Sequence, residues 1–298
     1  MGERGDDVSL MDRWARLVAT RIDPRPLAAT RLLVALAALV WLRTLWPRFD
    51  TGFDPSRMHI GWSLVGDRLV DLPPAVPRAL WLVGALVLAS GVAARVGAAS
   101  LAAGVALWLA VDRQHYANGS YFLLLVALLL VLVDSGGAWT PWGPVRRRIE
   151  WWPPFLLACQ LSIVYGWAAV QKFRVSALQG HTVDWQLQGP LADAVTWSLL
   201  PVALNLVGGL IEAFCAVGLW FARTRAWAIA AGIGLHIGIV LLVRGTGGLV
   251  FFGILSIAIY PAYSVVAPPL ARSLRPTPPY DAVDGDRRRP GVRAADAG

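Results

Sequence analysis

Charged side chains are scarce in this sequence: 15% of its 298 residues are charged, whereas 56% are hydrophobic. Soluble globular domains carry charge on about a quarter of their residues, so this composition excludes an ordinary soluble domain. Cysteine is rare too, and both cysteines, Cys159 and Cys215, lie inside apolar stretches. We therefore expect buried thiols that pack as small hydrophobic groups, with no disulfide framework and too few ligands for a metal site.

Lysine is nearly missing, because Lys172 is the only lysine among 27 basic residues. The sequence also lacks a Walker loop, a G-x-S-x-G elbow, an HExxH pair and a CxxC pair, so none of these motifs supports an enzyme class. Residues 1–26 contain no apolar stretch of the kind found in signal peptides. The net charge of +8 comes from arginines spread over loops and tails, a pattern that favours membrane anchoring over nucleic-acid binding.

Long apolar runs are what the sequence has instead. Runs of about 16 to 22 residues match what a helix needs to cross a bilayer core of about 30 Å. They are continuously apolar, whereas the strands of a membrane barrel alternate. We predict an all-α integral membrane protein with about eight transmembrane helices in one bundle. The predicted helices cover residues 27–47, 76–94, 96–111, 121–133, 155–172, 199–222, 226–243 and 248–267.

The predicted organisation has three parts. Residues 1–26 form an N-terminal segment, residues 27–268 form the transmembrane domain, and residues 269–298 form a disordered tail rich in proline, glycine and charge. An even number of helices places both termini on one side of the membrane. Roughly twice as many arginines fall on that side as on the other, so the positive-inside rule predicts a plasma-membrane protein with cytoplasmic termini.

Two ionisable residues lie near the middle of predicted helices, where an unpartnered charge is costly. Glu212 and His236 are almost equally far from the turn at 222–225, so we expect them at the same depth and within hydrogen-bond or one-water distance. Tyr165 can reach the same level. Two interpretations stay open: a structural pair that joins two helices, or a polar pocket for the head group of a lipophilic cofactor.

A second polar cluster is expected outside the membrane. The stretch "VDRQHYANGSYF", residues 111–122, separates two apolar runs. The outward end of the fifth helix and the segment after it carry further polar residues on the same side, namely Gln171, Lys172, His181, Asp184 and Trp185. Such a turn is ordinarily only solvated. Its density of functional groups, and the placement of the single lysine, favour a site, because lysine can lose its proton where arginine cannot. His59, in the long loop 48–75, is expected to be an isolated surface residue.

Four segments in this order resemble one family. They are "DRQHYANGSYFLLL", "CQLSIVYGWAAVQKF", "IEAFCAVGLWFARTRAWAIAAGIGLHIGI" and "GLVFFGILSIAIYP". Together they are similar to the horizontally transferred transmembrane (HTTM) domain, the membrane part of vitamin K-dependent γ-glutamyl carboxylase and its bacterial relatives, over residues 25–268. The resemblance implies a helical membrane domain that handles a hydroquinone, whose oxidation in the carboxylase yields the base that deprotonates substrate glutamate.

The resemblance also assigns residues. Asp112 matches the leading acid of the family motif, and Asn118, Ser120 and Tyr121 match its "NHSY" core. Lys172 matches a lysine after the "VY" helix, Glu212 stands where the family often has an acid, and His236 matches the "FH" histidine.

Departures from the family pattern imply that the carboxylation chemistry is lost. Arg113 occupies the position of the carboxylase's lysine base, and a guanidinium stays protonated at neutral pH. Gly119 replaces the motif's histidine, and no counterpart of the large substrate-binding soluble domain is expected.

The resulting hypothesis is a quinone-binding membrane protein without glutamate carboxylase activity and without a metal. Its cofactor pocket would contain Glu212, His236, Tyr165 and Asn118. The candidate catalytic residues are Lys172, Asp112, Arg113 and His115. The alternatives are a non-enzymatic scaffold, an immunity-type protein or a module that partners a membrane or redox protein. A small-molecule transporter is disfavoured, because no inverted repeat is visible.

Overall fold

The computed structural model describes residues 9–62, 66–141, 143–145, 147–174, 187, 199–244 and 246–274. Six of its helical segments are long and apolar enough to cross a membrane, and two shorter apolar helices, Ala75–Ser90 and Asn118–Leu132, accompany them. These segments occupy the eight apolar stretches of the sequence. The prediction of an all-α membrane protein is therefore confirmed.

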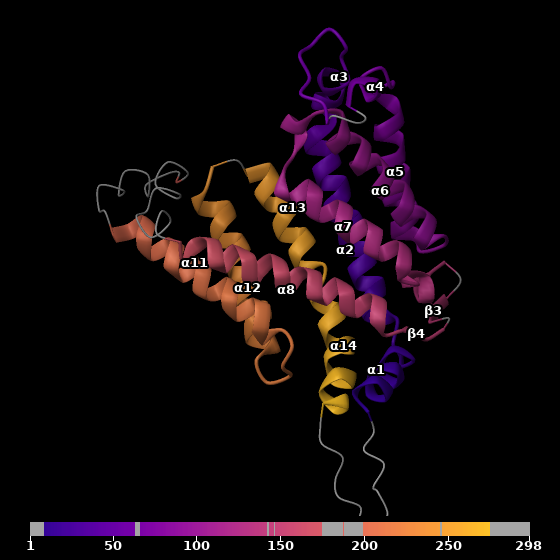
Figure 1. Ribbon diagram of the computed structural model, residues 1–298, viewed down its shortest axis with the longest axis vertical. Coiled ribbons are helices and arrows are strands. Elements are labelled where there is room, and N and C mark those ends of the chain that lie inside the picture. Colours follow the sequence, from indigo (N-terminus) through magenta and orange to yellow (C-terminus); the bar gives the residue numbers. More distant parts are fainter. Residues whose placement is uncertain are drawn as a thin grey trace, which may run out of the picture.

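Helices α2 (Arg25–Leu45), α5 (Ala75–Ser90), α6 (Ala94–Val111) and α7 (Asn118–Leu132) form one group, on the right in Figure 1. Helices α5 and α6 form a tight hairpin, in which Gly91 ends α5 in the left-handed conformation at φ 70°. Any Cβ at Gly84 would collide with the backbone of Leu101, and any Cβ at Gly97 would collide with that of Leu88. The two glycines therefore set the close approach of the hairpin.

Helices α8 (Trp152–Lys172), α11 (Leu199–Gly218) and α12 (Arg225–Leu242) form a second group, on the left in Figure 1. Pro153 and Pro154 lie in the first turn of α8, where the missing N–H groups have no helical partner to lose. Helix α13 (Thr246–Ile257) contacts both groups, because it packs against α2 and against α12.

The last predicted helix, 248–267, is interrupted. The helical structure is interrupted between α13 and α14 (Tyr260–Ser273), and Pro261 occupies the first turn of α14. Proline cannot donate the helical hydrogen bond and its ring displaces the carbonyl four residues earlier, which accounts for the break. Helix α14 then continues to Ser273, so the first residues of the predicted tail, from 269 onward, are helical, and Pro269 is buried.

Short elements close the end of the bundle at which α14 finishes. Helix α1 (Leu10–Val18) contacts α14, so the two described ends of the chain lie side by side. Strand β1 (Arg21–Ile22) pairs with β4 (Ile149–Glu150), and β2 (Ala138–Thr140) pairs with β3 (Gly143–Val145).

Short elements also cap the opposite end of the bundle. Helix η1 (Trp46–Arg48), α3 (Phe49–Gly52) and α4 (Gly66–Leu69) cover that end, next to η2 (Arg113–His115). The one-turn helix η3 (Ser135–Gly137) follows α7 and lies against β2, at the end described first.

Arg31 in α2 is fully buried. Its guanidinium donates hydrogen bonds to the carbonyl oxygens of Ser135 at 2.7 Å, Ala138 at 3.2 Å and Trp139 at 2.7 Å. Loop carbonyls thus take the place of solvent for the two terminal nitrogens of the guanidinium, while Nε has no hydrogen-bond partner in the described part of the chain. The first long helix is fastened to the connection between α7 and α8.

Candidate functional site

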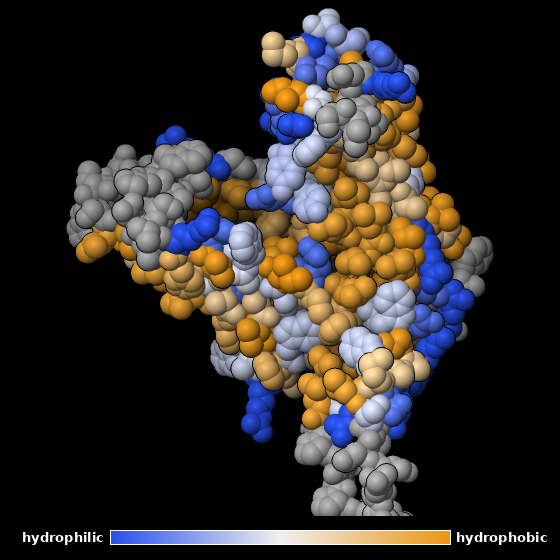
Figure 2. Space-filling model, in the orientation of Figure 1, coloured by the Kyte–Doolittle hydropathy of each residue, from blue (hydrophilic) through white to orange (hydrophobic). Residues whose placement is uncertain are grey.

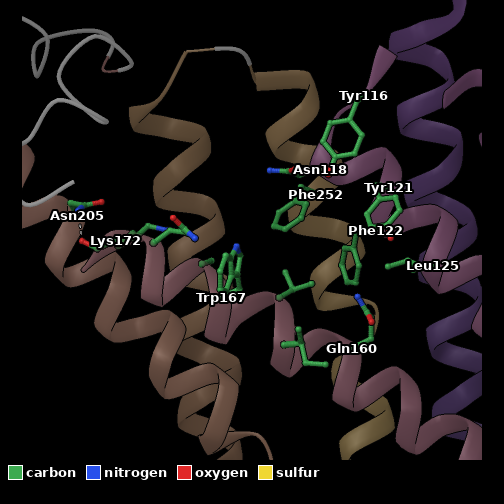
Figure 3. A pocket seen from close by; sticks show the side chains of 14 residues that line it. Tyr116, Asn118, Tyr121, Phe122, Leu125, Gln160, Trp167, Lys172, Asn205 and Phe252 are labelled. Carbon is green, nitrogen blue, oxygen red and sulfur yellow. Dashed lines mark hydrogen bonds between the residues drawn. The ribbon is translucent and has the colours of Figure 1, made fainter. Parts of the chain in front are cut away.

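A pocket of about 640 Å³ lies between α7 and α8 (Figure 3). Helix α8 contributes one face of the pocket, formed by residues three or four positions apart: Gln160, Ile163, Val164, Trp167, Ala168, Gln171 and Lys172. This spacing places them along one stripe of a helix. Helix α13 contributes Phe252 and α11 contributes Asn205. The surface is recessed at this point between the two groups of helices (Figure 2). The lining residues are Tyr116, Asn118, Tyr121, Phe122, Leu125, Gln160, Ile163, Val164, Trp167, Ala168, Gln171, Lys172, Asn205 and Phe252.

Aromatic rings form much of the pocket wall. Tyr116 and Tyr121 lie with ring centroids 6.0 Å apart, and Phe122 and Phe252 lie 5.9 Å apart. Trp167 leaves 63% of its surface exposed on an otherwise apolar helix. These rings provide large flat apolar surfaces, and the amides of Asn118, Gln160, Gln171 and Asn205 add a few polar groups. The pocket therefore suits a mainly apolar ligand with polar atoms at one or two positions.

An ion pair stands at the α8–α11 end of the pocket. The ammonium of Lys172 donates to both carboxylate oxygens of Glu212, at 2.7 and 2.6 Å. The Lys172 stem passes over two glycines of α11, and a Cβ at Gly209 would lie only 3.2 Å from the Cβ of Lys172. Asn205 donates to the carbonyl oxygen of Lys172 at 2.8 Å, which holds the end of α8 against α11.

Behind the pocket, three buried side chains share a hydrogen-bonded chain. The hydroxyl of Tyr165 lies 3.0 Å from Nε2 of His236 and 2.5 Å from the hydroxyl of Tyr260. The His236 ring is 6.0 Å from the ring of Phe252, edge to face, and Phe252 lines the pocket. One aromatic ring therefore separates this chain of hydroxyl and imidazole groups from the pocket.

Glu212 and His236 do not form the direct hydrogen bond that was one of the two expected arrangements, because each bonds to another partner among the described residues, and a contact through one water stays a prediction. Glu212 binds Lys172, and His236 binds Tyr165. Counting residues from the shared turn fixes the depth of a side chain in the membrane but leaves undetermined the direction in which it points around its helix. The long side chain of Lys172 also reaches a carboxylate deeper in the bundle than its own Cα.

Asp112 is buried at the end of α6 and organises the loop after it. Its Oδ1 accepts from the backbone N–H of Gln114 at 2.9 Å, which starts η2, and from that of Ile60 at 3.4 Å. Its Oδ2 lies 3.4 Å from Nδ1 of His59, a close electrostatic contact without hydrogen-bond geometry. The expectation that His59 is an isolated surface residue is therefore wrong, since its side chain is 10% exposed and packs against Asp112.

The other two loop residues with predicted roles also make structural contacts. His115 stacks on Trp108 at 3.8 Å, and its Nδ1 lies 3.0 Å from the Trp108 carbonyl oxygen. Burial lowers the pKa of His115, opposed by that backbone hydrogen bond and by the charge of Asp112. The Arg113 guanidinium lies over the ring of Trp62 at 4.9 Å.

The structure thus divides the predicted site residues into three sets. Lys172 and Asn118 line the pocket; Glu212, Tyr165 and His236 lie behind it; Asp112, Arg113 and His115 are absent from its described lining. His181, Asp184 and Trp185 fall outside the described residues.

The sequence analysis placed Gln171 with Lys172 in the second polar cluster, but it missed the pocket residues Gln160 and Trp167. Their helical spacing on α8 was the available signal. It missed Phe252 and Asn205 as well, which come from distant helices and carry no local signal.

A model of the HTTM domain family matches residues 76–260, which is more than half of the chain and includes the pocket residues and the Lys172–Glu212 pair. No curated protein and no solved structure matches the chain. The matched range contains three of the four sequence motifs in full and the fourth up to Tyr260. The chain belongs to the HTTM domain family.

Proposed function

We propose that this membrane protein binds a quinone-type lipophilic cofactor in the pocket between α7 and α8. The observation that carries the proposal is an aromatic cavity with a lysine–glutamate pair at one end. Ligand pockets commonly enclose about 300 to 1,000 Å³ and combine apolar walls with a few polar groups. A pocket of about 640 Å³ with this lining falls within that description.

The lining fits a quinone in its shape and in its polar groups. Phe122, Phe252 and Trp167 provide surfaces on which a flat ring can pack. The ammonium of Lys172 and the amides of Asn118 and Gln171 provide hydrogen-bond donors for ring oxygens. Ile163 and Trp167 are more than half exposed on the surface of α8, so an apolar tail can leave the pocket along that helix.

Bound in this pocket, the cofactor supplies electron transfer coupled to the uptake or release of protons. The neighbouring residues are suited to hold those protons. The ammonium of Lys172 forms an ion pair with the carboxylate of Glu212. A lysine ammonium can release its proton, whereas a guanidinium cannot. Tyr165 joins His236 and Tyr260 in one buried chain of exchangeable groups. We propose Lys172 and Glu212 as the proton-exchanging pair at the pocket.

We further propose that the chain does not carboxylate glutamate. Arg113 stands where the related carboxylase has its lysine base, and a guanidinium remains protonated near neutral pH. Its packing on Trp62 supports a structural role. We also propose a plasma-membrane location in which the end carrying α1 and α14 faces the cytoplasm, because arginine is concentrated at that end.

The decisive experiment begins with the full chain purified in mild detergent and analysed for co-purified quinones by mass spectrometry. A short-chain menaquinone analogue is then titrated while tryptophan fluorescence is followed. Trp167→Ala should weaken binding about tenfold, which corresponds to about 1.4 kcal/mol. Trp227→Ala is the matched control, because Trp227 is 73% exposed on α12 and does not line the pocket.

Two results would contradict the proposal: no quinone in the purified protein together with no saturable binding, or equal losses in the two tryptophan variants. The first result would favour the non-enzymatic scaffold or partner module.

Carboxylation is assayed separately by incorporation of labelled carbon dioxide into a glutamate peptide with reduced quinone. We expect no incorporation by the wild type. Quinone-dependent labelling that disappears in Lys172→Ala would refute this expectation and identify Lys172 as a base.

A further inference from the structure

A basic cavity lies at the end of the bundle that carries α1 and β4, away from the quinone pocket. It has two lobes of about 180 and 200 Å³, which share Arg95, Asp134 and Arg147. The first lobe is bounded by the α5–α6 turn and the start of α6. The second lobe is bounded by the end of α7, by β4 and by the start of α8, and it adds Arg21, Arg148 and Glu150.

The charges around the basic cavity do not balance. Arg147 is paired with Asp134, and Arg21 is paired with Glu150 at 3.3 Å. Arg95 and Arg148 also face the cavity, and neither has an ion-pair or hydrogen-bond partner in the part of the chain that the structure describes. Four arginines against two carboxylates leave the cavity with two uncompensated positive charges, a setting that attracts an anion.

The surroundings of the basic cavity indicate where its ligand comes from. Val92 and Val96 border the first lobe and are 49% and 66% exposed, and Leu132 borders the second lobe and is 45% exposed. In Figure 2 a hydrophilic strip at the lower right lies directly below the apolar surface over α5 and α6. Arginines thus meet exposed aliphatic side chains at the boundary where headgroups and acyl chains of a bilayer meet.

The start of α6 adds to the attraction for an anion. Ala93 precedes this helix and its side chain offers no hydrogen-bonding cap, so no side chain satisfies the first N–H groups of α6, and residues 93–96 line the first lobe. The positive end of the helix dipole acts in the same direction as Arg95 and Arg147.

We propose that the basic cavity binds the phosphate headgroup of an anionic phospholipid, while its acyl chains lie along Val92, Val96 and Leu132. Basic pockets between transmembrane helices on the cytoplasmic side are suited to such headgroups. A free soluble phosphate is also an anion, but it has no acyl chain that could contact the adjoining aliphatic surface. The bound lipid bridges the α5–α6 turn and the start of α8, two segments that meet at this cavity.

The test uses the full chain in detergent micelles and native mass spectrometry with added phosphatidylglycerol or phosphatidylcholine. Wild-type protein should retain phosphatidylglycerol in preference to phosphatidylcholine. Each arginine near an anionic lipid surface contributes about fivefold in affinity, so R95Q with R148Q should reduce the preference about 25-fold. R95K with R148K keeps both charges and should retain most of it.

The control is the double variant R223Q with R272Q, which removes two exposed arginines that do not line the basic cavity. It should leave the lipid preference unchanged. Thermal unfolding of each variant separates loss of binding from loss of folding. Both glutamine pairs replace exposed residues, so we expect the unfolding midpoints to stay close to that of the wild type. Equal retention of the two lipids by the wild type, an unaltered preference in R95Q with R148Q, or inorganic phosphate that competes at the same concentration as the lipid would overturn the proposal.

Discussion

Replacement of Lys172 by methionine should destabilise the helix bundle, because it leaves the Glu212 carboxylate buried without its cation. At 2.6 Å and an effective dielectric constant of about 20, the attraction in the pair is about 6 kcal/mol before desolvation is subtracted. Loss of one partner from a buried pair costs about 3 to 5 kcal/mol. The side chain of Lys172 is 28% exposed and that of Glu212 is 8% exposed, so water moderates the effect and we expect a loss of about 3 kcal/mol.

The assay is reversible unfolding in mixed micelles with increasing dodecyl sulfate, applied to K172M, E212L and the double variant. If the charges compensate each other, the double variant should lie within about 1 kcal/mol of the wild type, because both buried charges are then gone. R174M is the control, since Arg174 is an exposed cation two residues further on that bonds only to Gln171 among the described residues. Single-variant losses below about 1 kcal/mol that simply add in the double variant would refute the reasoning.

Three further predictions concern the loop, the hairpin and the topology. Burial lowers the pKa of His115, so the unfolded chain binds the proton more readily, and stability should fall as the pH drops below about 6.5; H115F, which keeps the stack on Trp108, should flatten that part of a pH-dependent unfolding curve. G97L should lower the unfolding midpoint by an amount equivalent to about 1 to 3 kcal/mol, because a side chain there overlaps the backbone of α5, and an unchanged midpoint would contradict the packing. In a chain with both native cysteines replaced, R57C should react with an impermeant thiol reagent in intact cells and R223C only after lysis; the opposite pattern would invert the proposed orientation.

The helices were largely predictable from the sequence because length and apolar character are local properties. A helix must supply about 20 apolar residues to cross the bilayer, so each long run identified its own segment. Proline lies in the first turn of α2 and of α8, where its missing N–H costs no helical hydrogen bond. The predicted helix 248–267 runs through Pro261, because the apolar run continues there, although the helix itself breaks before this proline.

The site was predictable only where one helix carried the pattern. Gln160, Trp167 and Gln171 recur on one face of α8, which a search for helical periodicity can detect. The partner of Glu212 depended on how α8 and α11 rotate against each other, and the position of His59 depended on the path of a long loop. Neither rotation nor loop path is encoded in the spacing of polar residues, so the Lys172–Glu212 pair and the contact of His59 with Asp112 were not predicted.

The burial of Arg31 has a consequence for the order in which the membrane protein is assembled. The nearest of its carbonyl partners, Ser135, lies 104 residues further along the chain. At a synthesis rate of about 5 to 20 residues per second, the ribosome needs about 5 to 20 seconds to produce that partner after Arg31 has been made.

During this interval α2 carries a cation whose hydrogen-bond acceptors do not yet exist, and burial in lipid would be costly. The first long helix to be synthesised therefore reaches its final position only after α5, α6 and α7 have been inserted. Substitutions in the segment 135–139 should then appear as defects in the final placement of α2, far from the mutated residues in sequence.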